Sequence, residues 1–162
     1  MELGEALLEH GRRVYSRVMD LNRVAFRATS HCLTGCGIGE TLGLALASWW
    51  ALGNAPSVAL AIVLAFFFGY LLTVWPLLRS GLGLGAAVGT ALVADTLSIV
   101  TMETVDNAVI VVWPGAMTAG LGDPIFWISL ALSLAIAFPP TFFVNRWLIA
   151  RGRGHAVVHT AH

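Results

Sequence analysis

The sequence predicts an all-α integral membrane protein, a four-helix bundle that follows an N-terminal amphipathic helix. Three observations predict this fold class. Of the 162 residues, 57% are hydrophobic and only 11% are charged, which is less than half the roughly 25% of a soluble domain. The apolar residues fall in four long runs, and the basic residues, all arginines, lie at or beyond the ends of those runs. The length predicts one domain, and the composition excludes a soluble globular enzyme, a disordered chain and a nucleic-acid-binding module.

Residues 1–30 form the first element. Apolar side chains recur at helical spacing from Leu3 to Ala25, and charged side chains lie mostly on the other side. This pattern predicts an amphipathic helix on the cytoplasmic surface of the membrane. A helix packed against its own bundle has the same pattern. Because the segment has no uninterrupted apolar run, we do not expect a cleavable signal peptide.

Four apolar runs follow. A transmembrane helix needs about 20 mostly apolar residues to cross about 30 Å of hydrocarbon. The runs that satisfy this length are residues 31–52, 57–78, 84–113 and 125–150. Two adjacent prolines in the last run, Pro139 and Pro140, remove two backbone donors and are expected to break that helix. The break would expose carbonyl oxygens that can bind a cation.

The arginines predict the orientation of the four spans. Five precede the first span, one lies between the second and third, and three lie at the end of the fourth and beyond it. Four spans therefore place all nine arginines on one face of the membrane. The positive-inside rule makes that face cytoplasmic. We expect a multi-pass protein of the cell inner (plasma) membrane, with the N-terminus and the tail of residues 151–162 in the cytoplasm.

The first candidate site is the motif His31, Cys32, Cys36 and Glu40. The two cysteines and the glutamate are spaced i, i+4 and i+8, so they form a stripe along one helix face. Thiolate and imidazole ligands suit soft or borderline metals such as Cu(I) or Zn(II). The cysteines could instead be a redox pair, which the reducing setting at the cytoplasmic end of the span disfavours, or small apolar residues of a core.

Two glycine seams accompany the spans. Gly35, Gly39 and Gly43 run beside the cysteine stripe, and Gly81, Gly85 and Gly89 open the third span. This spacing lets another helix approach to backbone contact. We expect tight helix junctions there and a homo-oligomer as one consequence.

The third span carries a second candidate site: Asp95, Met102, Glu103 and Asp106. Charged side chains in the bilayer cost several kcal/mol, from about 2.5 upward. Since no basic residue inside a span can pair with these carboxylates, a proton, a metal ion or a transported cation must supply positive charge. Counting from the span ends places Asp95 at a depth similar to that of Glu40, near mid-membrane. Glu103 and Asp106 come near the outer surface, where they would form a mouth or simply stand in water.

The C-terminal end carries a third candidate site. His155, His159 and His162 are spaced i, i+4 and i+7, which places them on one face if the tail is helical. Three imidazoles at that spacing suit zinc, copper or nickel. The alternative interpretation is a frayed terminus.

Three motifs together resemble those of a known family. They are His31-Cys32-xxx-Cys36-xxx-Glu40, Met102-Glu103-xx-Asp106-Asn107 and Gly154-His155-xxx-His159-xx-His162. The chain resembles an uncharacterised family, named only as a domain of unknown function, of small bacterial membrane proteins with four spans. The resemblance implies that architecture over nearly the whole chain and points to the motif residues as sites, without implying a reaction. A looser similarity to small mercury- and copper-handling membrane proteins rests on the cysteine pair, although their adjacent-cysteine motif is absent here.

The leading hypothesis is a cation-binding membrane protein that transports or delivers a transition metal, copper or zinc. The path would run from Glu103 and Asp106 past the mid-membrane carboxylates to the cysteines and the tail histidines. One alternative is a non-transporting oligomeric subunit or assembly factor, in which the polar residues only specify packing. Another is a membrane redox protein that carries haem or a metal centre. The sequence indicates no enzymatic reaction.

Overall fold

The computed structural model describes the backbone of residues 2–151 and the side chains of residues 16–151. Within these residues the chain is all-helical and contains no strand. The elements are α1 (Glu2–Trp49), α2 (Asn54–Arg79), α3 (Leu84–Val112), the short 3-10 helix η1 (Ala116–Thr118) and α4 (Pro124–Ala150). The expected all-α fold class is confirmed.

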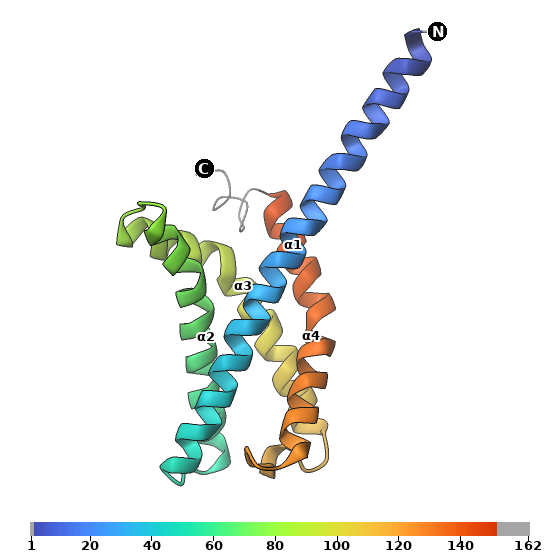
Figure 1. Ribbon diagram of the computed structural model, residues 1–162. Coiled ribbons are helices and arrows are strands. Elements are labelled where there is room, and N and C mark those ends of the chain that lie inside the picture. The colour runs from blue at the N-terminus through green and yellow to red at the C-terminus, as the bar shows by residue number, and fades with distance from the viewer. Residues whose placement is uncertain (1, 152–162) are drawn as a thin grey trace.

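The four helices run alternately in opposite directions (Figure 1). The turn between α1 and α2 lies at the same end of the bundle as the connection between α3 and α4. The turn between α2 and α3 lies at the other end, toward the N-terminus. Consequently α1 and α3 run in the same direction, and a residue late in either helix lies toward the loop end that holds η1.

Three helices, α2, α3 and α4, are long and apolar enough to cross a membrane. They begin and end within three residues of the second, third and fourth apolar runs; the largest difference is the start of α2 at Asn54 against Ser57. The run expected as the first span, residues 31–52, forms the second half of α1 and the turn after it.

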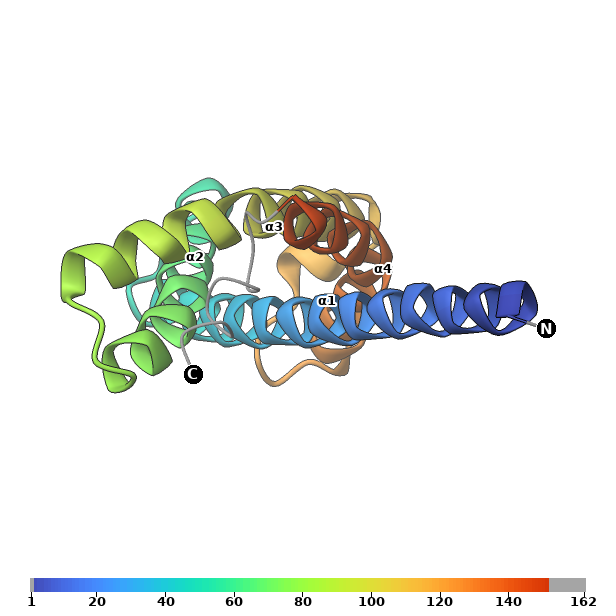
Figure 2. The same ribbon diagram turned by 90° about the horizontal axis from the view of Figure 1, so that it is seen from above.

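Helix α1 joins two segments that the sequence separates at residue 30. It continues over 48 residues without interruption, or about 72 Å at 1.5 Å per residue. That length is more than twice the roughly 30 Å of a hydrocarbon core. The first half of α1 therefore projects beyond the other three helices (Figures 1 and 2).

The expected break at Pro139 and Pro140 is wrong. Helix α4 continues through both prolines from Pro124 to Ala150. Pro139 is exposed and Pro140 only half-buried, so neither ring displaces a neighbouring helix. Directly after Pro140, the Thr141 hydroxyl donates a hydrogen bond to the Ala137 carbonyl at 2.8 Å. Proline is tolerated inside membrane helices because nearby groups and local adjustments of the backbone compensate for the lost donors.

The glycines of α1 form the closest helix contact in this region. A Cβ atom at Gly35 would lie 2.8 Å from the Gly69 Cα atom, and one at Gly43 would lie 2.5 Å from the Ala61 Cα atom. One at Gly39 would overlap the Ala65 backbone. The prediction that this seam permits backbone contact is confirmed, and its partner is α2 of the same chain.

We therefore expect Gly39→Ala to destabilise the protein. Filling a close-packed contact costs about 1–3 kcal/mol, which outweighs the gain of about 1 kcal/mol from replacing a helical glycine by alanine. Gly37→Ala is the matched control, because a Cβ atom there would meet only the Leu134 side chain at 3.5 Å. Thermal unfolding in detergent should show a lower midpoint for Gly39→Ala and an equal or higher one for Gly37→Ala. Equal midpoints for both variants would contradict this account of the seam.

Candidate functional site

A pocket of about 430 Å³ opens at the loop end of the bundle. Its walls come from all four helices and η1. Three carboxylates line it: Glu40 from α1, and Glu103 and Asp106 from α3. Asn107 lies beside them. We call the three carboxylate residues, Glu40, Glu103 and Asp106, the acidic group.

The acidic group is buried despite lining a pocket. Glu40 is 8% exposed, Glu103 5% and Asp106 2%. One oxygen of each, Oε1 of both glutamates and Oδ1 of Asp106, receives no hydrogen bond. Within the described part of the chain, no basic side chain lines this pocket. The carboxylates therefore lack the positive charge that buried carboxylates normally have nearby.

The contacts within the acidic group connect three helices. The Asn107 amide donates a hydrogen bond to Glu103 Oε2 at 3.3 Å. The carboxyl groups of Glu40 and Asp106 lie within interaction distance of each other, and Ser133 of α4 lies beside Asp106. The pocket wall is thus fixed by contacts among α1, α3 and α4.

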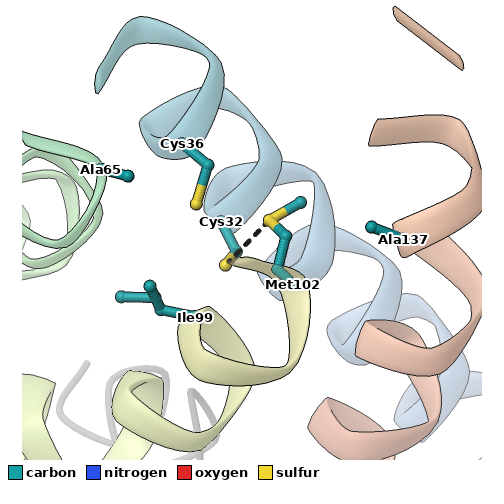
Figure 3. Close-up of a cluster of buried hydrophobic side chains, with 6 residues drawn as sticks. All are labelled: Cys32, Cys36, Ala65, Ile99, Met102 and Ala137. Carbon is teal, nitrogen blue, oxygen red and sulfur yellow. Dashed lines mark hydrogen bonds between the residues drawn. The ribbon is translucent and has the colours of Figure 1, made fainter. Parts of the chain in front are cut away.

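Next to the acidic group lie three buried sulfur atoms, those of Cys32, Cys36 and Met102, which we call the sulfur cluster (Figure 3). The thiol of Cys32 is 3.6 Å from the Met102 Sδ atom. Cys36 lies within interaction range of both Cys32 and Glu103. Both cysteines are free thiols. The sulfur cluster therefore adjoins the acidic group directly.

A second cavity, with no room for a water molecule, lies on the far side of the sulfur cluster. Its lining includes Cys32, His31 and Asp95. Ser98 of α3 and Asn145 of α4 complete its polar side. The three groups follow one another along the bundle: the acidic group, the sulfur cluster, and the pair His31 and Asp95.

The expectation that Glu40 and Asp95 share one depth is wrong, because they line different pockets. The Cys32–Met102 contact sets the offset between α1 and α3. Glu40 lies eight residues from Cys32 toward the loop end, a rise of about 12 Å. Asp95 lies seven residues from Met102 in the opposite direction, a rise of about 10 Å. Counting depth from the span ends ignores this offset between the helices.

Sequence reasoning missed a polar network that joins three helices. The Ser98 hydroxyl donates a hydrogen bond to Asn145 Oδ1 at 2.6 Å, and Asn145 Nδ2 donates to the Thr29 hydroxyl oxygen at 3.0 Å. The Thr29 hydroxyl in turn donates to the Ala25 carbonyl at 2.8 Å. An available signal was a buried i, i+4 stripe of small and polar residues on α4: Ser129, Ser133, Ala137, Thr141 and Asn145.

The structure thus sorts the candidate residues into groups. His155, His159 and His162 lie outside the described residues. Among the side chains of residues 16–151, no three or more His, Cys, Asp or Glu side chains are arranged to hold a metal ion together. The acidic group accordingly lines a wall of the pocket without converging on one point.

A family model described as a domain of unknown function, DUF4396, matches residues 21–154. The match covers most of the chain, including the acidic group, the sulfur cluster, and the pair His31 and Asp95. The chain belongs to the DUF4396 family. This finding confirms the family resemblance expected from the sequence. No match to the chain was found among curated proteins or among solved structures.

The polar network predicts a measurable stability difference in this DUF4396 protein. Thr29→Val removes a hydroxyl that accepts from Asn145. Hydrogen bonds between membrane helices contribute about 0.6 kcal/mol on average and up to about 1.7. Unfolding of the variant in detergent should therefore require less denaturant. Thr104→Val is the control, because the exposed Thr104 hydroxyl bonds only the Val100 carbonyl of its own helix. An equal loss of stability in both variants would show that the hydrogen bonds of the polar network do not stabilise the protein.

Proposed function

We propose that this protein binds a cation inside its membrane bundle and passes it along the bundle axis, with a transition-metal ion, copper or zinc, as the cargo. The observation that carries the proposal is the acidic group. Its three carboxylates are buried, each has an oxygen without a hydrogen bond, and no basic side chain lines their pocket within residues 16–151.

The energetics favour a cation in this pocket. Each charged side chain within the hydrocarbon costs at least about 2.5 kcal/mol unless a charge of opposite sign compensates it. The pocket volume of about 430 Å³ accommodates an ion that keeps part of its water shell. Because the carboxylates do not converge, they would attract such an ion into the pocket without stripping it of water.

The order of the donor atoms supports passage of the ion from the pocket into the bundle. Cys36 lies within interaction range of Glu103 and of Cys32, and the Cys32 thiol is 3.6 Å from Met102. Cys32 also lines the cavity that His31 and Asp95 line. Oxygen donors are thus followed along the bundle by sulfur donors and then by the imidazole of His31.

The positions of the arginines support an orientation for this passage. Arg79 ends α2 and Arg151 follows α4, both at the end of the bundle opposite the acidic group. Each lies over an aromatic ring, Arg79 4.9 Å from the Trp75 centroid and Arg151 4.1 Å from the Trp147 centroid. Tryptophan and arginine at that level favour a membrane–water interface there. We place this end and both termini in the cytoplasm of a plasma-membrane protein, with the projecting half of α1 extending from the membrane into the cytoplasm and the acidic pocket on the opposite side.

The proposal predicts that cation uptake depends on the acidic group. In vesicles that contain the purified protein, Glu103→Gln/Asp106→Asn should lower uptake of copper or zinc at least about tenfold, or about 1.4 kcal/mol. The reason is that the variant removes two charges that attract the ion. Elemental mass spectrometry of the washed vesicles measures the uptake.

Asp20→Asn is the matched control for this measurement. Asp20 is exposed on the projecting half of α1, far from the pocket, so removing its charge should leave uptake unchanged. The circular dichroism signal of the helices checks that each variant folds. Uptake equal to that of the unaltered chain in the Glu103/Asp106 variant would contradict the proposed function.

A second candidate function, an oligomeric subunit, is favoured by one observation. Nothing lies within 4 Å of Cβ atoms built at Gly85 and Gly89 on α3. Since small residues at this spacing let helices of two chains approach closely, we propose a homo-oligomer through this face. Gly89→Leu should then shift the protein to a smaller species in light scattering in detergent, and Val88→Leu on the adjacent exposed face should not. An unchanged mass for Gly89→Leu would exclude this interface.

A further inference from the structure

The sulfur cluster is the one group of donor atoms along the proposed path in which three side chains meet closely within an apolar surrounding. Cys36 and Met102 are fully buried, and Cys32 is 7% exposed. Ile99, Ala65 and Ala137 surround them (Figure 3). Donor atoms of this kind, in a dry site, select among cations by their chemical softness.

We infer that Cys32, Cys36 and Met102 form a three-sulfur binding site for Cu(I). The inference rests on the proposed function and deepens it, because it identifies the cation as a soft monovalent one. It also separates this site from the acidic group, which attracts the ion but does not ligate it there.

The distances fit a three-coordinate ion. With metal–sulfur bonds of about 2.3 Å, the value for zinc thiolates, and angles of about 120°, two sulfur ligands stand about 4 Å apart. The thiol of Cys32 and the thioether of Met102 are 3.6 Å apart. Cys36 lies one helical turn from Cys32, in contact with it. A small outward shift of these side chains therefore makes room for the ion between them.

The ligand types distinguish Cu(I) from Zn(II). Structural zinc sites take four ligands from Cys, His, Asp and Glu. The third ligand here is the thioether of Met102, and thiolate together with thioether sulfur selects Cu(I). Glu40 lines the other pocket, and His31, although it lies beside Cys32, is not arranged with both cysteines to hold a metal ion among the described side chains.

Binding also requires that protons leave the site. The Cys32 and Cys36 thiols each lose a proton as the two copper–thiolate bonds form, and two thiolates with Cu(I) carry one negative charge. The Glu103 carboxylate, which lies within interaction range of Cys36 and in the wall of the open pocket, accepts one proton and becomes neutral, and the other proton leaves to water in that pocket. The site together with Glu103 therefore keeps the single negative charge that it had before binding, so no additional charge is placed in the apolar surrounding. No electron is transferred, since copper enters and remains as Cu(I).

The test is a Cu(I) titration of the purified full-length chain in detergent, without oxygen, in competition with a chromophoric Cu(I) chelator. The titration is repeated in a chain with His155, His159 and His162 replaced by alanine, so that tail ligands are counted separately. We expect one Cu(I) per chain in the tail variant. X-ray absorption of the bound copper should show a first shell of sulfur alone.

Variants of the sulfur cluster give the second readout. Removing a residue that only hydrogen-bonds to a metal ligand lowers metal affinity 10- to 100-fold. Since removing a ligand itself costs more, Cys32→Ala or Cys36→Ala should lower the Cu(I) affinity at least about 100-fold. Met102→Leu keeps most of the side-chain volume and should lower it about tenfold. Met19→Leu is the control, because Met19 is 50% exposed on the projecting half of α1.

The outcomes separate this inference from the proposed function. A first shell of oxygen or nitrogen in the tail variant, or equal Cu(I) affinity in Met102→Leu and Met19→Leu, would overturn the three-sulfur site. Carboxylate-dependent zinc uptake without Cu(I) binding would overturn it too, while leaving the proposed function in place. If sulfur binds Cu(I) but the Glu103→Gln/Asp106→Asn variant takes up as much cation as the unaltered chain, the three-sulfur site is supported and the proposed path is contradicted. The absorption spectrum of the tail variant needs no substitution within the bundle, so a sulfur-cluster variant that misfolds leaves the test intact.

Discussion

The backbone contact between α1 and α2 is the constraint on which the rest of the bundle depends. Gly35, Gly39 and Gly43 lie so close to Ala61, Ala65 and Gly69 that no side chain fits between the two helices. The glycines and the cysteine stripe occupy adjacent faces of α1, because neighbouring residues are about 100° apart around a helix. Fixing the glycine face against α2 therefore turns Cys32, Cys36 and Glu40 toward α3. The same contact occupies this seam within one chain, so an oligomer would need a different surface.

That arrangement produces a bundle interior whose donor atoms change along its length. Carboxylate oxygens come first at the loop end, sulfur atoms follow, and imidazole and carboxylate groups come last toward the arginine-rich end. Hard oxygens attract any hydrated cation, whereas buried sulfur discriminates strongly in favour of soft ones. An interior graded in this way is suited to admit cations broadly and to retain one kind. The hydrogen bonds from Asn145 to Ser98 and Thr29 hold α1, α3 and α4 together beside the sulfur cluster.

Much of the fold follows from the sequence. The apolar runs predicted α2, α3 and α4 to within three residues, because a helix that can cross a membrane requires length and apolarity, both of which are local properties. The break predicted at Pro139 and Pro140 did not occur, since one turn of a membrane helix can compensate for proline through neighbouring groups. The continuity of α1 through residue 30 was also missed. Both errors came from treating a change in local pattern as the end of a helix.

The candidate site divides in the same way. By itself, the sequence determined the helical membrane class, the family, the residue types that carry charge and sulfur, and the ability of the glycine seam to admit a helix. Each of these depends on composition or on spacing within one helix. Only the tertiary structure decided that Glu40 joins Glu103 and Asp106 rather than Asp95, that Met102 meets the cysteines, and that α2 fills the seam. Those facts depend on the offset and tilt between helices, which are set by contacts between residues 70 or more positions apart, such as Cys32 with Met102 and Thr29 with Asn145.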